Sequence, residues 1–311
     1  MRIGIDASRA AAANRPDVLF VPAHVIPLVH PAASVATIHD LGHLYFPDSY
    51  PASTLRYLDW ATRHNIRSAA HLLADSEATK RDMVERMDVD PERVTVVYPG
   101  VSPVYFEPIQ ASARMQVRQK YRIDGPYLLY VGTLQPRKNV ERLVEAYLIA
   151  RREFHIEERL VLAGQLGWLP EGILGKLQSA GNQVTLAGYV PDEDLPALYA
   201  EATAVALPSL YEGFGMPLAE AMAVGTTVIG STAGSLPEVV GDAGLIVEPV
   251  DTQEIAEALA WACGHQRERA VLAARGRVRA AGFSWEASGA RALEVLRRVG
   301  QDTPPGLAVK W

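Results

Sequence analysis

A chain of 311 residues, of which 49% are hydrophobic and 21% are charged, contains enough apolar material for two modest domains with separate cores. Its formal net charge of −6 disfavours a nucleic-acid-binding protein, in which a basic patch is expected. The single cysteine, Cys263, excludes a disulfide within the chain.

The N-terminal residues 1–6 form an apolar run that is too short, and too soon broken by Asp6, for a signal peptide. No apolar stretch reaches the length of a membrane span, so we expect a cytoplasmic protein. Peripheral contact with the inner face of a membrane stays open. Arg56, Arg63 and Arg67 could share one side of a helix, but the acid Asp59 interrupts them, which favours a solvated face.

Short β-branched runs alternate with helix-length stretches along the chain. In the first half, the strand-like runs cover residues 2–5, 18–21, 35–38, 71–74 and 94–97. In the second half, they cover residues 127–131, 160–163, 184–187, 204–207, 227–229 and 245–247. The proline-rich region between the two halves indicates an interdomain connection. Buried strands that alternate with helices predict parallel, doubly wound sheets.

In open parallel sheets, ligands bind beyond the carboxyl ends of the strands, so residues that directly follow strand-like runs are candidate site residues. His39 follows the run at residues 35–38 and precedes Asp40. A histidine in such a position is more often structural than catalytic, and His43 is interpreted as structural. Ser76 is explained as the N-cap of the helix that follows it.

The segment Glu212-Gly-Phe-Gly-Met-Pro-Leu-Ala-Glu220 places two carboxylates on either side of a glycine loop that leads into a helix. Pro217 suits the first helical position, and Gly225 suits the end of the helix. We therefore expect the N–H groups of residues 217–219 to face a phosphate, with the helix dipole adding to the attraction. Either glutamate alone is as well explained by a solvated loop acid or by a favourable position in the helix dipole.

The whole pattern resembles the E-x-seven-E signature of retaining GT-B glycosyltransferases, in particular glycosyltransferase family four. Residues 224–247 are similar to the continuation of that family's sequence, and the resemblance extends from about residue 32 to residue 285. It implies an α/β fold of the GT-B class, in which two Rossmann-like parallel-sheet domains face each other across a cleft, here with a shortened N-terminal domain.

We expect an acceptor-side domain at residues 1–108, a linker at 109–125 and a nucleotide-sugar-binding domain at 126–284. In relatives the last helix crosses back to the first domain, and here it would cover about residues 285–300. In relatives a glycine-containing loop, a helix and further sheet elements follow the first strand. Here Asp6 lies only nine residues before Arg15, which shortens this region.

The segment from Gly132 to Asn139 resembles the phosphate loop of the family. Lys138 falls on the lysine position of that loop, whereas Thr133 stands where the family has an arginine. Arg137, beside Lys138, could supply the missing charge. Cations at the start of a helix are unfavourable alone, so this pair also suggests a bound anion.

The resemblance implies further roles. Glu212 matches the acid that contacts the donor sugar, Glu220 matches the residue that holds the ribose hydroxyls, and the main chain near Val190 matches the loop that holds the base. His39 matches a first-domain position that faces the donor sugar. The implied catalytic residues are Glu212, His39 and Lys138. The implied donor-binding residues are Gly132, Thr133, Arg137, Lys138, Val190, Gly213, Phe214, Gly215, Met216, Pro217, Leu218 and Glu220.

The implied reaction transfers a hexose, with retention, from a nucleoside-diphosphate sugar to a glycan or lipid-linked acceptor, without a metal or another cofactor. The similarity of residues 136–139 to bacterial mannosyltransferases of surface polysaccharide biosynthesis makes GDP-mannose the first guess for the donor. The alternative is a nucleotide-sugar-binding protein with little or no turnover, which the shortened first domain favours. Intact Glu212, Lys138, His39 and Glu220 favour the enzyme.

Two other interpretations are weaker. Asp88 and Asp90 form a D-x-D pattern, which metal-dependent glycosyltransferases of another fold use to bind Mn²⁺ or Mg²⁺, but their place in a proline-containing turn favours solvated acids. A nicotinamide dinucleotide enzyme is disfavoured because no G-x-G-x-x-G follows the first strand of either half.

Overall fold

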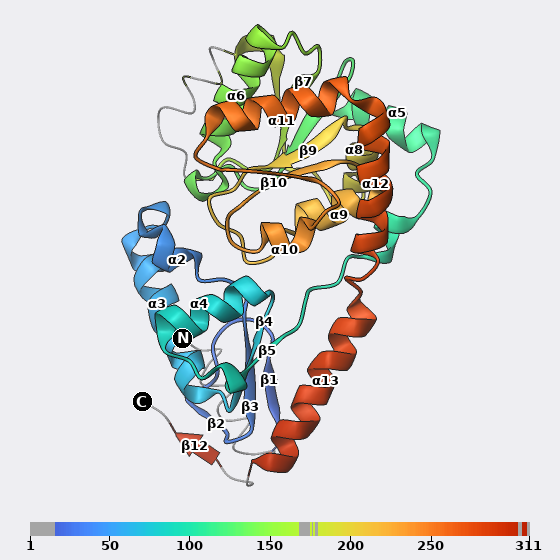
Figure 1. The fold of residues 1–311 in the computed structure, drawn as a ribbon. Helices are drawn as coiled ribbons and strands as arrows, with labels where there is room; N and C mark the ends of the chain where they lie inside the picture. The colour runs from blue at the N-terminus through green and yellow to red at the C-terminus, as the bar shows by residue number, and fades with distance from the viewer. Residues whose placement is uncertain (1–15, 168–174, 176, 178–179, 304–306, 310–311) are drawn as a thin grey trace. The chain divides into compact units, whose positions relative to one another are not determined.

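The structure is a computed structural model, and it describes residues 16–167, 175, 177, 180–303 and 307–309. The strand predicted at residues 2–5 and the shortened segment between Asp6 and Arg15 lie outside the described residues. The chain forms two compact units, of which the first contains Met1–Gly100 and Trp285–Trp311 and the second contains Val101–Ser284. Figure 1 shows the elements of both units.

The first unit holds a four-stranded parallel sheet in the order β1-β3-β4-β5. These strands are β1 (Leu19–Val21), β3 (Ser34–Ile38), β4 (His71–Ala74) and β5 (Val94–Val96). Side chains alternate between the two faces of a strand, and both faces of β3 and β4 are buried. Apolar side chains cover both faces of the sheet, so the continuous apolar runs of the sequence are those of buried parallel strands.

The helices of the first unit follow the strand ends. They are α2 (Gly42–Tyr45), α3 (Ala52–Ser68), α4 (Glu77–Met87), α13 (Trp285–Asp302), and the short 3-10 turns η1 (Pro47–Ser49) and η2 (Pro91–Arg93). The Ser76 hydroxyl accepts a hydrogen bond from the Thr79 N–H at 3.0 Å, which confirms the predicted N-cap of α4. Val295 and Val299 of α13 pack against Val35 and Leu73 of the sheet, so this helix belongs to the first unit.

A two-stranded antiparallel ribbon also forms in the first unit, from β2 (Val29–Pro31) and β12 (Leu307–Val309). The sequence analysis did not predict these strands. Val29-His-Pro31 is not an apolar run, and it pairs with residues at the far end of the described chain, so no local pattern indicated this ribbon.

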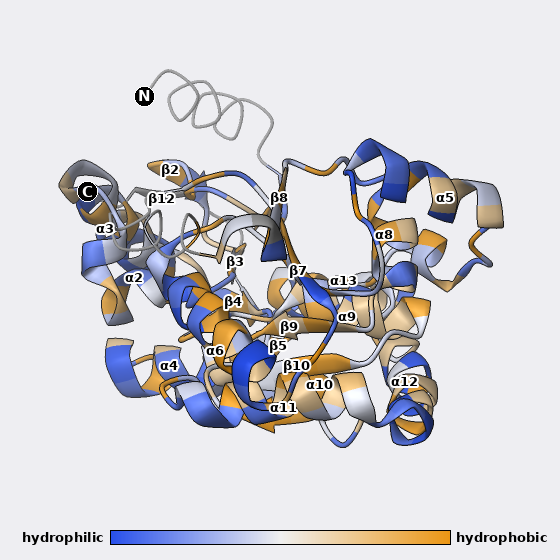
Figure 2. Cartoon of the chain, turned by 90° about the horizontal axis from the view of Figure 1, so that it is seen from above, coloured by the Kyte–Doolittle hydropathy of each residue, from blue (hydrophilic) through white to orange (hydrophobic). Residues whose placement is uncertain are grey.

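The second unit holds a six-stranded parallel sheet in the order β11-β10-β9-β6-β7-β8. Its strands are β6 (Tyr127–Val131), β7 (Arg159–Ala163), β8 (Val184–Gly188), β9 (Ala204–Leu207), β10 (Val228–Ser231) and β11 (Leu245–Val247). Figure 2 shows hydrophobic residues along β9 and β10, and every residue of both strands is buried. The predicted α/β class with parallel sheets is confirmed. The strand order reverses between β6 and β9, which are neighbours.

Helices lie on both faces of this sheet (Figure 1). Helices α6 (Val140–Glu153) and α11 (Thr252–Gly264) pack together on one face. The other face carries α8 (Leu195–Glu201), α9 (Met216–Val224), α10 (Leu236–Val240) and α12 (Gln266–Ala280). The remaining elements are α5 (Ala111–Lys120) and the 3-10 turns η3 (Pro103–Phe106), η4 (Pro136–Lys138) and η5 (Gly181–Gln183).

The segment expected as a linker, residues 109–125, differs from that expectation. It contains α5, which packs on α8 within the second unit, while the chain passes from the first unit to the second after Gly100. Arg114 and Arg118 of α5 pair with Glu201 of α8 at 3.3 and 3.2 Å. These contacts depend on residues more than 80 positions apart, so the sequence pattern alone does not reveal them. Among the described residues, none of the helices combines the length and hydropathy that a bilayer crossing requires.

Candidate functional site

Lys138 and Glu212 meet at the carboxyl ends of the two strands between which the sheet order reverses. Lys138 follows β6 in the turn η4, and Glu212 follows β9. The Lys138 Nζ lies 2.6 Å from the Glu212 Oε1 and 2.7 Å from its Oε2. In doubly wound folds this reversal is the place where nucleotides bind. The two residues that the sequence analysis assigned to phosphate and sugar are therefore in direct contact.

The Glu212 carboxylate is held from several sides. Its side chain is only 6% exposed, and that of Lys138 is 14% exposed. The Ser209 hydroxyl donates to the Glu212 Oε1 at 2.7 Å, and the Arg137 Nη1 lies 3.7 Å from the Oε2. A buried carboxylate needs such partners to offset the loss of water. The sequence analysis did not identify Ser209, although it lies three residues before Glu212 on the same loop.

The backbone of Glu212 is fixed by the loop between β10 and α10. Both the N–H and the hydroxyl of Ser235 donate to the Glu212 carbonyl, at 3.2 and 3.1 Å. Gly234 has a φ of 59°, and a Cβ on it would lie 2.5 Å from the same carbonyl oxygen. Only glycine allows the two backbones to approach so closely. This contact was not predicted, but the small residues after the neighbouring strand are a sequence signal that could have suggested it.

Arg137 is buried beneath this site. Its Nη1 donates to the Tyr211 carbonyl at 2.9 Å, and its own carbonyl accepts from the Leu210 N–H at 2.9 Å. The guanidinium thus holds the loop that carries Glu212. Thr133, at the family's arginine position, is exposed. The sequence analysis considered Arg137 as a replacement for that arginine, whereas the structure shows its guanidinium engaged with the loop.

The structure corrects the expected donors at the start of α9. The helix begins at Met216, with Pro217 in its first turn. The N–H groups of Leu218 and Ala219 donate to the Gly215 carbonyl at 3.0 and 3.4 Å, and proline has no N–H. The prediction that the N–H groups of residues 217–219 face a phosphate is therefore wrong. Gly215 is the N-cap residue of α9, with a φ of 100°, and the carbonyl of an N-cap residue accepts the first hydrogen bond within its helix.

The rest of the glycine loop and helix agrees better with the sequence pattern. Gly225 ends α9 in the left-handed region, with a φ of 92°, as predicted. Phe214, by contrast, is a core residue, since its buried ring packs edge-on against Phe283 with ring centroids 5.1 Å apart. Its side chain stabilises the loop, so only its main chain could contact a donor.

Glu220 lies on α9 and faces two tyrosines. The Tyr199 hydroxyl donates to the Glu220 Oε2 at 2.9 Å. Burial raises the pKa of Glu220 to about 7, the Tyr199 and Tyr105 phenols lower it by hydrogen bonding, and Asp192 raises it. Val190 is buried in the same loop as Asp192. The loop that carries Val190 therefore lies close enough to Glu220 for the charge of Asp192 to act on it.

Gly132 follows β6 directly, with a φ of 147°. A Cβ on Gly164, at the end of β7, would lie 1.9 Å from the Gly132 carbonyl oxygen. The loops after these two strands therefore approach each other through their backbones, which requires glycine at residue 164.

In the first unit, His39 pairs with Asp75. The His39 Nδ1 lies 2.7 Å from the Asp75 Oδ2, and its Nε2 lies 2.9 Å from the Pro22 carbonyl oxygen. Both partners are acceptors, so the charged form of the ring, in which both nitrogens donate, satisfies both contacts. Hydrogen bonding to Asp75 is the main cause of a raised His39 pKa. Asp75 follows β4, the neighbour of β3, and this topology could have identified it.

The remaining sequence candidates have local roles. Asp40 accepts a hydrogen bond from the Gly42 N–H at 2.8 Å. Burial lowers the pKa of His43, which is a core residue. Asp88 ends α4 with a φ of 54°, and Asp90 accepts from the Glu92 N–H at 2.9 Å, so these exposed acids shape a turn. Within the described residues, no group of three or more His, Cys, Asp or Glu side chains gathers to hold a metal ion.

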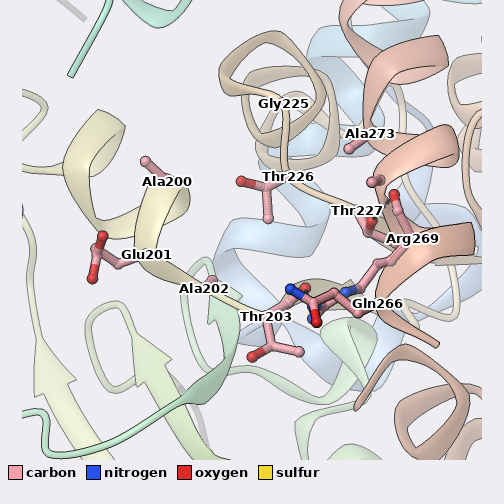
Figure 3. Close-up of a pocket in the computed structure, with 11 residues that line it drawn as sticks. Ala200, Glu201, Ala202, Thr203, Gly225, Thr226, Thr227, Gln266, Arg269 and Ala273 are labelled. Atoms are coloured by element: carbon pink, nitrogen blue, oxygen red, sulfur yellow. Dashed lines mark hydrogen bonds between the residues drawn. The ribbon is translucent and has the colours of Figure 1, made fainter. Parts of the chain in front are cut away.

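A cavity of about 360 Å³ opens elsewhere in the second unit, at the amino ends of β9 and β10 (Figure 3). The Thr226 hydroxyl donates to the Tyr199 carbonyl at 2.8 Å, and the Thr227 hydroxyl donates to the Arg269 carbonyl at 2.9 Å. The Arg269 guanidinium donates to the Thr203 carbonyl at 2.9 Å. These polar groups hydrogen-bond to backbone carbonyls. The cavity lies at the amino ends of the strands, whereas Lys138 and Glu212 lie at the carboxyl ends.

Two family models match the sequence. The model described as glycosyl transferases group 1 matches residues 114–279, more than half of the chain. The model described as glycosyltransferase family 4 matches residues 3–104. Together these matches cover most of both units.

Individual relatives agree with the family models. The O-antigen chain mannosyltransferase B of Escherichia coli is 35% identical over 257 residues, which cover 81% of this chain and 67% of that protein. The serotype-specific mannosyltransferase WbdA of Escherichia coli is 29% identical over 89% of this chain and 35% of that protein. The chain thus spans about two thirds of the first relative and about one third of the second. Among solved structures, the sucrose-phosphate synthase from Thermosynechococcus elongatus is 27% identical with a TM-score of 0.72, and the match covers 87% of this chain and 68% of that one.

Proposed function

This chain belongs to the group 1 glycosyltransferases, and on that basis we propose that it transfers a hexose from a nucleoside-diphosphate sugar to a glycan or lipid-linked acceptor, with retention and without a metal ion. The observation that carries the proposal is the position of Lys138 and Glu212 at the topological switch point of the second sheet. Mannose is our first choice of sugar, with GDP-mannose as donor, because the Escherichia coli relatives bear the name mannosyltransferase.

The ion pair offers a cation for the diphosphate and, next to it, a carboxylate for the sugar. Lys138 carries three N–H donors, so its ammonium can bind a phosphate oxygen and still donate to Glu212. Glu212, held by Ser209, can accept a hydrogen bond from a sugar hydroxyl. The sugar is thereby held beside the cation that stabilises its leaving group.

In the proposed reaction, the anomeric C–O bond to the diphosphate breaks while the acceptor oxygen forms the new glycosidic bond on the same face. The leaving phosphate takes the proton of the acceptor hydroxyl, so no protein nucleophile is required. Lys138 stabilises the negative charge that grows on the diphosphate, and in a site shielded from water this preorganised charge is most effective. Glu220 and the main chain near Val190 hold the ribose and the base.

Replacing Lys138 by alanine tests the phosphate assignment. We expect GDP binding to weaken by about 1.5–3 kcal/mol, the worth of charge-assisted hydrogen bonds, while guanosine binding changes little. Isothermal titration calorimetry with both ligands measures the difference, after a thermal-shift screen of nucleotide sugars has shown which base the protein prefers.

The control is Ser209→Ala, which also disturbs Glu212 but removes no cation. This variant should bind GDP nearly as well as the native protein. Equal losses for GDP and guanosine in Lys138→Ala, or an equal loss of GDP affinity in both variants, would contradict the phosphate assignment.

A further inference from the structure

The Glu220 carboxylate lies among two phenols and one acid. Tyr199 of α8 is fully buried and donates to the Glu220 Oε2 at 2.9 Å. Tyr105 of η3 is 5% exposed, and its ring lies against that of Tyr199 with centroids 6.0 Å apart and planes inclined by 59°. Asp192, in the loop before α8, is the acid that acts on Glu220 by charge. These groups come from three different segments of the second unit.

Tyr105 stands at an unusual place in the chain. It lies only four residues beyond Val101, where the chain enters the second unit. Pro103 starts the η3 turn, and the Tyr105 N–H donates to the Ser102 carbonyl at 3.1 Å, so the backbone is fixed locally. The turn packs on α9, the helix that carries Glu220. A buried phenol normally has a polar partner. The packing of η3 on α9 and of the Tyr105 ring on Tyr199 brings this phenol near Glu220, whose charge acts on it.

We propose that Tyr105 is a positioning residue for nucleotide binding, which together with Tyr199 holds Glu220 as a carboxylate ready to accept the ribose hydroxyls. This inference rests on the proposed function, because it assigns the partners of the residue that holds the ribose. Tyr105, in the segment that leads into the second unit, thereby gains a role in nucleotide binding.

The hydrogen-bonding capacity of a carboxylate supports the assignment. An ionised carboxylate has about four acceptor sites. Tyr199 uses one of these sites. In our proposal the Tyr105 hydroxyl donates to a second site and the two hydroxyls of a ribose use the others, so every site has a donor. A protonated carboxyl carries a hydrogen on one oxygen, and it then offers fewer acceptors to the ribose. Nucleotide binding therefore requires the ionised form.

The pH dependence follows from the surroundings of Glu220. Burial raises the pKa of Glu220 to about 7, Tyr199 and Tyr105 lower it, and Asp192 raises it. Nucleotide affinity should therefore increase as the pH rises through this pKa. The loss of the Tyr105 hydroxyl removes a donor that favours the ionised form, so the pKa of Glu220 rises and the midpoint of binding moves to higher pH.

Calorimetry of GDP, UDP and ADP binding between about pH 5.5 and pH 9 tests the inference in native protein and Tyr105→Phe. Below its pKa, the ionised fraction of a carboxyl group falls as that pKa rises, so we expect binding to Tyr105→Phe to weaken severalfold at about pH 6 and to stay unchanged at about pH 9. Comparison with native protein at each pH cancels the titration of the ligand's own phosphates. Tyr199→Phe should move the midpoint in the same direction.

Tyr147→Phe is the matched control. Its phenol is also buried in the second unit, but it donates to the Glu158 and Gln183 carbonyls at 3.1 and 3.0 Å. This variant should leave the midpoint unchanged, and inorganic pyrophosphate should bind native protein and Tyr105→Phe equally well. An equal loss at every pH, or no loss, in folded Tyr105→Phe overturns the inference and leaves the proposed function intact. If native protein binds none of the three nucleotides, both are overturned.

Discussion

At the residue scale, the ion pair of Lys138 and Glu212 adds little to stability, but it fixes the positions of both charged groups. Both side chains are largely shielded from water, and such pairs stabilise a fold little, because the loss of hydration offsets the attraction. Removal of one partner, however, leaves an uncompensated charge. The pair is best understood as a preorganised group at the strand ends, where Ser209 and Arg137 keep Glu212 in place.

His39 offers a second test at this scale. Its pKa is raised above 6.5 chiefly by the hydrogen bond to Asp75, so the charged ring should persist to higher pH than in an ordinary histidine. The stability from this pair is fully present below the unfolded pKa and is lost as the pH rises through the folded pKa. In Asp75→Asn we expect the pKa of His39 to fall, as measured by NMR of the imidazole carbon-bound protons.

The resonances of His43 serve as an internal reference in that titration, since its pKa is lowered by burial and Asp75 is not among the causes. An unchanged His39 pKa in folded Asp75→Asn would show that the carboxylate does not control the charge of this ring.

The residue types at the site were predictable from the sequence, whereas their partners were not. The spacing of Glu212 and Glu220 and the position of Lys138 after a strand identified them. Asp75 directly follows the predicted strand at residues 71–74, which was a signal that could have identified it, whereas no local pattern distinguishes Tyr105 from other tyrosines. The N–H groups of residues 217–219 were misassigned because α9 begins at Met216, so the N–H groups of Leu218 and Ala219 already bond to the N-cap carbonyl of Gly215.

At the element scale, two loops determine where Glu212 lies. One leads from β9 into α9, and the other leads from β10 into α10 and bonds to the Glu212 carbonyl through Ser235. The apolar runs predicted the strands of the two parallel sheets to within two residues. The helix α5 was taken for a linker because prolines flank it. The ribbon of β2 and β12 was missed because Val29-His-Pro31 is not an apolar run and its partner strand lies near the other end of the chain.

Gly234→Ala should disturb this arrangement. The residue has a positive φ, and its new Cβ would approach the backbone of Glu212 within 2.5 Å, so the loop must shift. We expect the free energy of unfolding to fall by about 2–4 kcal/mol, from backbone strain and the steric contact together. Urea denaturation measures this loss, and sugar transfer should fall with it.

Gly225→Ala is the matched control for this prediction. Gly225 also has a positive φ, but nothing lies within 4 Å of the position that a Cβ would take there, so only the backbone strain of about 1 kcal/mol is expected. Equal losses in the free energy of unfolding of the two variants would show that the steric contact with Glu212 does not destabilise Gly234→Ala.

At the scale of the whole molecule, stability and nucleotide binding make opposite demands on Glu220. Its pKa is about 7 in the folded protein, against 4.5 for an ordinary glutamate, so the folded state binds more protons than the unfolded state between these values. The free energy of unfolding contributed by this group therefore falls as the pH rises from 4.5 to about 7. The ionised Glu220 that we propose to bind the ribose therefore lowers the free energy of unfolding when no nucleotide is bound.

Glu220→Gln should show this directly. Relative to native protein, the variant should gain roughly 3 kcal/mol of stability between acidic pH and about pH 8, because the glutamine does not titrate. Denaturation at several pH values measures the change, and nucleoside binding should weaken in the same variant. A difference between variant and native protein that is constant with pH would contradict the assigned pKa.

The central claim is retaining transfer without a metal ion, and NMR of the product tests it most directly. GDP-mannose and a mannose-terminated acceptor would be incubated with the 311-residue chain in excess chelator, and the anomeric proton and carbon of the new linkage would be recorded. We predict an α-mannoside, which retains the configuration of the donor. A β-mannoside, a reaction that requires added Mn²⁺, or donor binding without any transfer would contradict the account, and the last result would favour a nucleotide-sugar-binding protein.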